Sequence, residues 1–145
     1  MAASRTTAQR AADFKTYVVV PPADLSSALR EELLSFRTLQ GWLSAAVTRR
    51  DGLTIQHTLA TGAEAASLSA MAAALVGSAR STGNELEQGP FQYGIVQYNE
   101  GVLVVTEAGP EAILACLLAS HVNLGLALLK IHRVSKSIGA RLEAV

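Results

Sequence analysis

The sequence contains a single cysteine, Cys116, among 145 residues. One cysteine excludes an intramolecular disulfide and a zinc site built from several thiolates. Cys116 lies in the apolar run 112–119, where a buried, unreactive thiol is the expected state. Packing of apolar side chains therefore has to hold the fold together.

Charged and aromatic residues are also scarce, at 17% and 5% of the sequence respectively. Twelve basic residues balance twelve acidic ones, so no net charge attracts nucleic acid or an acidic membrane surface. No apolar run reaches the roughly 18 residues of a membrane span. Half of the residues are hydrophobic, which predicts one compact core in a single cytoplasmic domain.

Motifs for catalysis and for cofactor binding are missing from the sequence. It lacks a phosphate-binding glycine loop, a dinucleotide-binding glycine pattern, a His-Glu-x-x-His metal motif and a Gly-x-Ser-x-Gly elbow. The three histidines, His57, His121 and His132, fall on separate predicted elements. We interpret them as surface or turn residues, with a metal ligand or general base at His121 as the less favoured alternative. We therefore predict a protein without catalytic residues, metal or cofactor, which acts by binding other proteins.

What the sequence does have is a clear succession of helix and strand signals. Apolar residues at helical spacing predict a first helix that begins with Asp24 as its cap and ends at Gly41; they are Leu25, Leu29, Leu33, Phe36 and Leu39. Asp51-Gly52 between the β-prone runs 42–50 and 53–59 predicts a hairpin, because glycine supplies the positive φ of a tight turn.

The second half of the chain repeats the strand signals and ends in a helix. Runs 91–98 and 102–107 flank Asn99-Glu100-Gly101 and predict a second hairpin. The apolar run 113–118 is typical of a strand covered on both faces, at the centre of a sheet. Asn123 is a suitable cap for a last amphipathic helix.

This succession predicts the fold class. The order α-β-β-α-β-β-β-α indicates an α/β (α+β) domain: a five-stranded, mainly antiparallel sheet with helices on both faces. We assign residues 23–145 to this domain. Residues 1–22 are interpreted as a flexible tail, with a possible extra strand at 17–20 that is stopped by Pro21 and Pro22.

The middle helix, predicted from Ala63 to about Leu86, has two faces that both suit packing. One is an ordinary core stripe of Leu68, Met71, Ala72, Leu75, Ala79 and Leu86. The other is small and uncharged, and comprises Ala66, Ala70, Ala73, Ala74 and Gly77. No charge occurs between Glu64 and Arg80. We predict that this second face contacts its copy across a two-fold axis; the alternative is an alanine-rich helix exposed to solvent.

The strand predicted at 91–98 adds to this interface. Gln92, Gly94 and Val96 alternate with larger apolar residues, and the run has no lysine or proline of the kind that protects a sheet edge. If this strand lies at the edge of the sheet, its free backbone groups can pair with the same strand of a second copy. The predicted dimer interface therefore comprises Ala66, Ala70, Ala73, Gly77, Gln92, Gly94 and Val96.

Basic residues mark the outer face of the last helix. Lys130, Arg133, Lys136 and Arg141 project away from its apolar stripe. They form either an ordinary solvated face or a basic docking surface, and the sequence leaves both open.

Four stretches together resemble the roadblock/dynein-light-chain family. They are 41–55, the alanine-rich 65–79, 101–106 and 119–125, and the similarity extends from Leu25 to Leu142. The resemblance implies a five-stranded antiparallel sheet with the central helix on one face and the terminal helices on the other. It also implies dimers formed through the central helix and the neighbouring edge strand. Prokaryotic members of the gliding-motility regulator type bind a Ras-like small GTPase, and some stimulate its hydrolysis.

These observations define three functional hypotheses. The first is a non-catalytic homodimeric adaptor that binds and regulates a Ras-like small GTPase. The second is a dimeric scaffold or motor subunit without a GTPase partner. The third is a small-ligand sensor, which requires a cavity with a few convergent polar groups. Arg49 and Arg50 beside the first turn additionally raise the less favoured idea of an arginine finger supplied to the GTPase.

Overall fold

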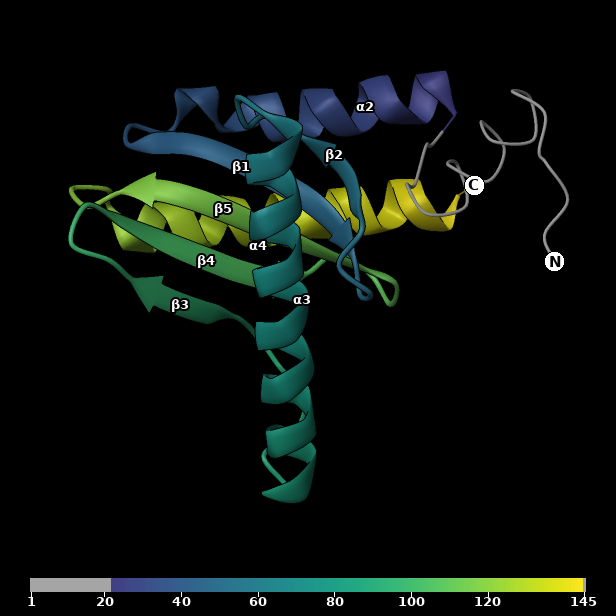
Figure 1. Cartoon of the computed structure of the whole chain (residues 1–145), viewed down its shortest axis with the longest axis vertical. Coiled ribbons are helices and arrows are strands. Elements are labelled where there is room, and N and C mark those ends of the chain that lie inside the picture. Colours follow the sequence, from purple (N-terminus) through teal and green to yellow (C-terminus); the bar gives the residue numbers. More distant parts are fainter. Residues whose placement is uncertain (1–21, 145) are drawn as a thin grey trace, which may run out of the picture.

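The computed structural model describes residues 22–144, so the predicted strand at 17–20 lies outside the described range (Figure 1). Three α-helices, one 3₁₀ turn and five strands occur in that range. Their bounds are α2 (Ala23–Leu34), η1 (Ser35–Thr38), β1 (Trp42–Arg49), β2 (Thr54–His57), α3 (Gly62–Glu85), β3 (Gly94–Gln97), β4 (Gly101–Glu107), β5 (Ala112–Ala119) and α4 (Leu124–Glu143). The predicted order of elements is confirmed.

The five strands form one sheet in the order β2-β1-β5-β4-β3, and each neighbouring pair is antiparallel. The central position of β5 confirms the prediction from its apolar run, and residues 112–116 are buried. β2 and β3 are the two edges, each four residues long.

Helices cover both faces of the sheet, with α2 and α4 on one side and α3 on the other (Figure 1). The larger core lies under α2 and α4 and includes Leu29, Leu33, Phe36, Val104, Leu114, Ile131 and Ile138. The smaller core lies under α3 and consists of Ala72, Val76, Leu103, Val105, Ile113 and Ala115. None of the described helices is both long enough and apolar enough to cross a bilayer.

Local side-chain chemistry explains where the elements begin and turn. Gly52 has a φ of +91° in the first hairpin turn, and the Asp51 carboxylate accepts a hydrogen bond from the Leu53 amide at 3.2 Å. The Asn123 side chain caps α4 by accepting from the Leu126 amide at 3.1 Å. Both predictions are confirmed.

Three predicted boundaries were wrong. Asp24 is not a cap, because α2 begins after Pro22 without a side-chain cap and Asp24 lies inside its first turn. A carboxylate there still interacts favourably with the helix dipole. The first helix ends at Leu34 and tightens into η1 instead of continuing to Gly41. The strand predicted at 91–98 is regular only over Gly94–Gln97.

Candidate functional site

The face of α3 that packs on the sheet differs from the predicted stripe. The buried residues are Ala65, Ser69, Ala72 and Val76, whereas Leu68, Met71, Leu75 and Ala79 are only half-buried. Leu86, predicted in the core, is 63% exposed. Ser69 tolerates burial because its hydroxyl is hydrogen-bonded to the Thr54 hydroxyl at 2.7 Å.

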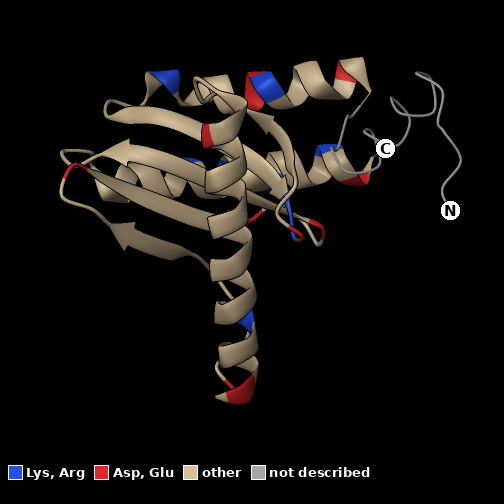
Figure 2. Ribbon diagram, viewed as in Figure 1, with Lys and Arg blue, Asp and Glu red and all other residues tan. Residues whose placement is uncertain are grey.

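The opposite face of α3 is open, small and uncharged. Ala66, Ala70, Ala74 and Gly77 are exposed, and a Cβ atom placed on Gly77 would meet nothing within 4 Å. Figure 2 shows no charged residue over the middle of this helix. Ala73 differs from the others, because it is half-buried against the second core near the Gly52 turn. We call the exposed residues 66, 70, 74 and 77 the small face of α3.

The helix α3 also extends beyond the sheet. It crosses the strands near its N-terminal half, and its C-terminal half continues past the edge strand β3 (Figure 1). Arg80 ties this half to the end of β4 through an ion pair with Glu107 at 3.0 Å. The small face runs along α3 from the β1–β2 turn, where a Cβ atom placed on Gly52 would lie 3.5 Å from Ala70 Cα, toward the β3 edge.

β3 is the edge strand that the C-terminal half of α3 passes, and an edge position is what the dimer hypothesis required of this strand. Gly94 lies under α3, since a Cβ atom there would come within 2.8 Å of Leu75 Cδ2. Val96 is half-buried on the same side, against the second core. By strand alternation, Ile95 points to the opposite face, and it is 40% exposed.

The backbone of β3 has one open side. The Tyr98 amide donates to the Gly101 carbonyl at 2.8 Å, so Tyr98 faces β4 with its backbone groups. Because such pairs alternate along an antiparallel ladder, the backbone groups of Ile95 and Gln97 point away from β4. Within the part of the chain that the structure describes, these groups have no strand partner, so another strand can pair with them.

The predicted interface residues thus fall into three groups. Ala66, Ala70 and Gly77 lie on the small face, while Ala73, Gly94 and Val96 lie between α3 and the sheet. Gln92 precedes β3, and its carbonyl accepts from the Thr106 hydroxyl at 2.9 Å. A contact between two copies through these residues remains a prediction.

The candidate chemical groups do not converge. His121 and His132 are exposed, and the half-buried His57 accepts a hydrogen bond from the Leu59 amide at 3.1 Å. Across residues 22–144, no group of three metal-ligating side chains comes together. Cys116 is fully buried, and burial raises the pKa of its thiol, which disfavours the reactive thiolate.

Both arginines beside the first turn already have acidic partners. Arg49 pairs with Asp51 at 2.6 Å, and Arg50 lies 3.6 Å from Glu107. An arginine finger would have to leave these partners before reaching another protein.

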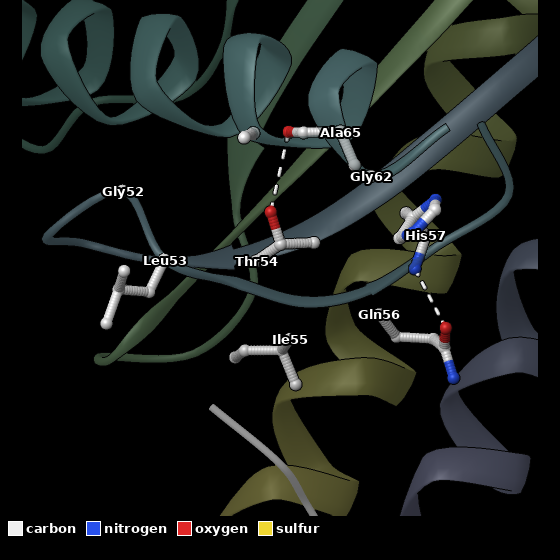
Figure 3. Close-up of a pocket in the computed structure, with 9 residues that line it drawn as sticks. Gly52, Leu53, Thr54, Ile55, Gln56, His57, Gly62 and Ala65 are labelled. Carbon is white, nitrogen blue, oxygen red and sulfur yellow. Dashed lines mark hydrogen bonds between the residues drawn. The ribbon is translucent and has the colours of Figure 1, made fainter. Parts of the chain in front are cut away.

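A hollow of about 360 Å³ lies between β2 and the first turns of α3, lined by residues 52–57, Gly62, Ala65 and Ala66 (Figure 3). Its polar groups are bonded to one another: the Thr54 hydroxyl donates to the Ala65 carbonyl at 3.4 Å, and the His57 amide donates to the Gln56 side chain at 2.9 Å. Few polar groups remain to orient a ligand, which weakens the small-ligand hypothesis.

Comparison with known proteins agrees with this architecture. A sequence model of the Roadblock/LC7 domain matches residues 29–118, and no curated protein matches the chain. A structure described as MglB with tetrameric arrangement has a TM-score of 0.77 at 20% identity, covering 86% of this chain and 95% of that chain. The gliding protein MglB from Thermus thermophilus gives 0.76 at 22% identity, covering 87% and 96%. A Roadblock/LC7 domain from Streptomyces avermitilis gives 0.72 at 22% identity, covering 84% and 98%.

Proposed function

Because the chain belongs to the Roadblock/LC7 domain family, we propose that it is a non-catalytic homodimeric adaptor that binds and regulates a Ras-like small GTPase. The observation that carries the proposal is the presence together of the small, uncharged face of α3 and of the open edge at β3, which the C-terminal half of α3 passes. A protein that worked alone would be expected to place charged side chains on such an exposed helix face and protective residues, such as lysine or proline, on such an edge strand.

Two copies related by a two-fold axis can use both features at once. The small side chains of Ala66, Ala70 and Gly77 allow two α3 backbones to approach closely, since no longer side chain separates them. The backbone groups of Ile95 and Gln97 can pair with those of the second copy, which joins two sheets into one. Burial of this uncharged surface provides the driving force for association.

The similar structures support assembly as a property of the fold. One of them is described as MglB with tetrameric arrangement, and it is among the chains most similar in shape to this one. A tetramer of this protein would contain the same two-fold contact and a second one.

Regulation without catalysis is consistent with the scattered chemical groups. A Ras-like GTPase carries its own nucleotide site, so a partner needs only to hold its loops in one conformation. Such a role places the protein in the cytoplasm with its partner. The favoured second candidate is a dimeric scaffold without a GTPase, which requires the same dimer interface.

The first test is the mass in solution by light scattering. We expect the wild-type chain to have about twice its mass of 15.2 kDa. Gly77→Glu should yield monomer, because the two-fold contact would bury two like charges together. The matched control is Ala140→Glu, on the exposed surface of α4 on the other side of the sheet, and it should leave the mass unchanged. A wild-type monomer at high concentration would contradict the proposal.

The second test measures binding to Ras-like GTPases from the source genome, loaded with GDP or with a non-hydrolysable GTP analogue. We expect one of them to bind with a preference for one nucleotide state, and Gly77→Glu to lose that binding. A wild-type dimer that binds none of them would leave the scaffold function in place of the regulator. Replacement of Arg49 and Arg50 with alanine should leave any stimulated hydrolysis intact.

A further inference from the structure

The helical layer formed by α2 and α4 leaves one strand of the sheet uncovered. Ile95 of β3 and Val104 of β4 are directly paired in the ladder and therefore point to the same face. Val104 is fully buried in the core under α2 and α4, whereas Ile95 is 40% exposed. The boundary between covered and bare sheet runs between β4 and β3.

A groove follows this boundary along α4. Two adjoining hollows of about 300 Å³ each share Gln92, Thr106 and His132 among their lining residues. The first hollow also contains Tyr93, Leu128 and Leu129. The second contains Ser135 and Lys136. We call this feature the α4–β3 groove.

The apolar end of the groove is exposed to an unusual degree. Leu129 is 66% exposed and Tyr93 is 50% exposed, while Leu126 on the same helix is 57% exposed. Together with Ile95 they account for four of the seven large exposed hydrophobic residues found among residues 22–144. Such clustering marks an interaction site more often than scattered single residues do.

The charge around the groove has one sign. α4 carries no acidic residue from Leu124 to Leu142, and it presents exposed Arg133 and Lys136. The one acid that lines the groove, Glu107, is paired with Arg80 at 3.0 Å and lies 3.6 Å from Arg50. An occupant therefore meets an apolar floor with a basic rim.

From these observations we propose that the α4–β3 groove binds an amphipathic, acidic segment of a partner protein. Its apolar side chains would cover Tyr93, Ile95 and Leu129, and its carboxylates would face Arg133 and Lys136. The stretch from Gly125 to Lys136 is about 17 Å long, which accommodates about three turns of a helical segment. This site is separate from the predicted dimer contact, because edge pairing uses the backbone of β3 and leaves its face open.

The test uses selection from a random peptide library of about 16 residues per peptide, displayed on phage, with the full chain as bait. We expect enriched peptides to combine Leu, Ile or Phe at helical spacing with Asp or Glu. A synthetic peptide of the enriched sequence is then titrated by fluorescence anisotropy. Leu129→Glu should weaken its binding at least about 10-fold, because it removes apolar contact and places a carboxylate beside those of the peptide.

A second variant separates the charge contribution from the apolar one. The double substitution Arg133→Gln and Lys136→Gln should weaken binding by several-fold and flatten its dependence on salt, because exposed charge pairs are screened by ions. The matched control is Leu43→Glu, which changes a leucine that is 52% exposed and lines none of the groove. It should bind the peptide as the wild type does.

Two outcomes would overturn the proposal. One is that no acidic amphipathic peptide is enriched, or that the enriched peptides bind Leu129→Glu unchanged. The other is that Leu129→Glu lowers the mass in solution, which would show that a second copy covers the groove. Gly77→Glu should keep peptide binding, so failure of the dimer hypothesis and failure of this one are distinguishable.

Discussion

The two edge strands of the sheet, β2 and β3, are of equal length, but in the described part of the chain side chains bond the outer backbone groups of β2 only. At β2, the His57 amide donates to the Gln56 side chain at 2.9 Å, and the His57 carbonyl accepts from the Arg30 guanidinium at 3.1 Å. The side-chain amide of Gln56 also donates to the Ser26 carbonyl of α2 at 3.1 Å. At β3, no side chain of residues 22–144 bonds the outward backbone groups of Ile95 or Gln97.

This difference indicates which edge is available to a partner. Proteins that remain monomeric cover or interrupt their edge strands, because exposed backbone groups recruit other strands. The chain covers β2 with side chains of α2 and of β2 itself, whereas within residues 22–144 it leaves the edge of β3 bare. Asymmetric protection of this kind favours pairing in one orientation only.

The largest effect on self-association should come from a substitution that blocks backbone pairing at the β3 edge. Gln97→Pro removes an outward amide without breaking the ladder to β4, because proline is tolerated on the free side of an edge strand. The loss occurs twice in a two-fold dimer, so the dissociation constant should rise about 100-fold, measured by sedimentation or light scattering.

The matching substitution at the protected edge is His57→Pro. It also removes an outward amide, yet it should leave the dissociation constant unchanged, because β2 takes no part in the contact. Equal effects of the two prolines on self-association would contradict the assignment of β3 as the dimer edge.

An intermediate effect, on stability, should come from the close contact between β3 and α3 at Gly94. Gly94→Ala places a methyl group within 2.8 Å of Leu75 Cδ2 and 3.3 Å of Val105 Cγ2. We expect a loss of about 1 kcal/mol in the free energy of unfolding, measured with urea. Combined with Leu75→Ala, the same substitution should cost clearly less, because the obstructing methyl group is gone. Additive losses would mean that Leu75 does not set the position of β3.

The smallest effect should come from opening the protected edge. Arg30→Ala frees the His57 carbonyl on the exposed surface, so the free energy of unfolding should fall by only about 0.5 to 1 kcal/mol. Hydrogen exchange should accelerate at β2 and the turn after it, and stay unchanged at β3. Arg37→Ala, which alters an exposed arginine bonded to the Leu34 carbonyl, serves as the control and should not affect exchange at β2.

Local signals in the sequence were sufficient for most of the fold. The Asp51-Gly52 turn, the Asn123 cap and the apolar run of β5 each depend on neighbouring residues, and the structure confirms all three. Asp24 was misassigned because an acid near a helix start suits both the cap and the first turn.

The candidate site was harder to predict because it depends on distant contacts. In an alanine-rich helix the two faces differ little in hydrophobicity, so the rotation of α3 on the sheet was not readable from spacing alone. Burial of Ser69 depends on Thr54, fifteen residues away. The hydrogen bond from Arg30 to the backbone of β2 and the exposure of Ile95 likewise depend on which helix lies over which strand.

The single cysteine provides a built-in probe for opening of the core of this domain. Cys116 sits in the central strand, paired with Ala45 on one side and Val104 on the other, and its side chain lies in the core under α2 and α4, so a thiol reagent reaches it only when that core opens. The rate at which the reagent modifies Cys116 in native buffer therefore measures how often the core opens. A second cysteine introduced on the surface could carry a fluorophore at a single position while Cys116 stays silent, which makes the assembly of two copies visible by energy transfer.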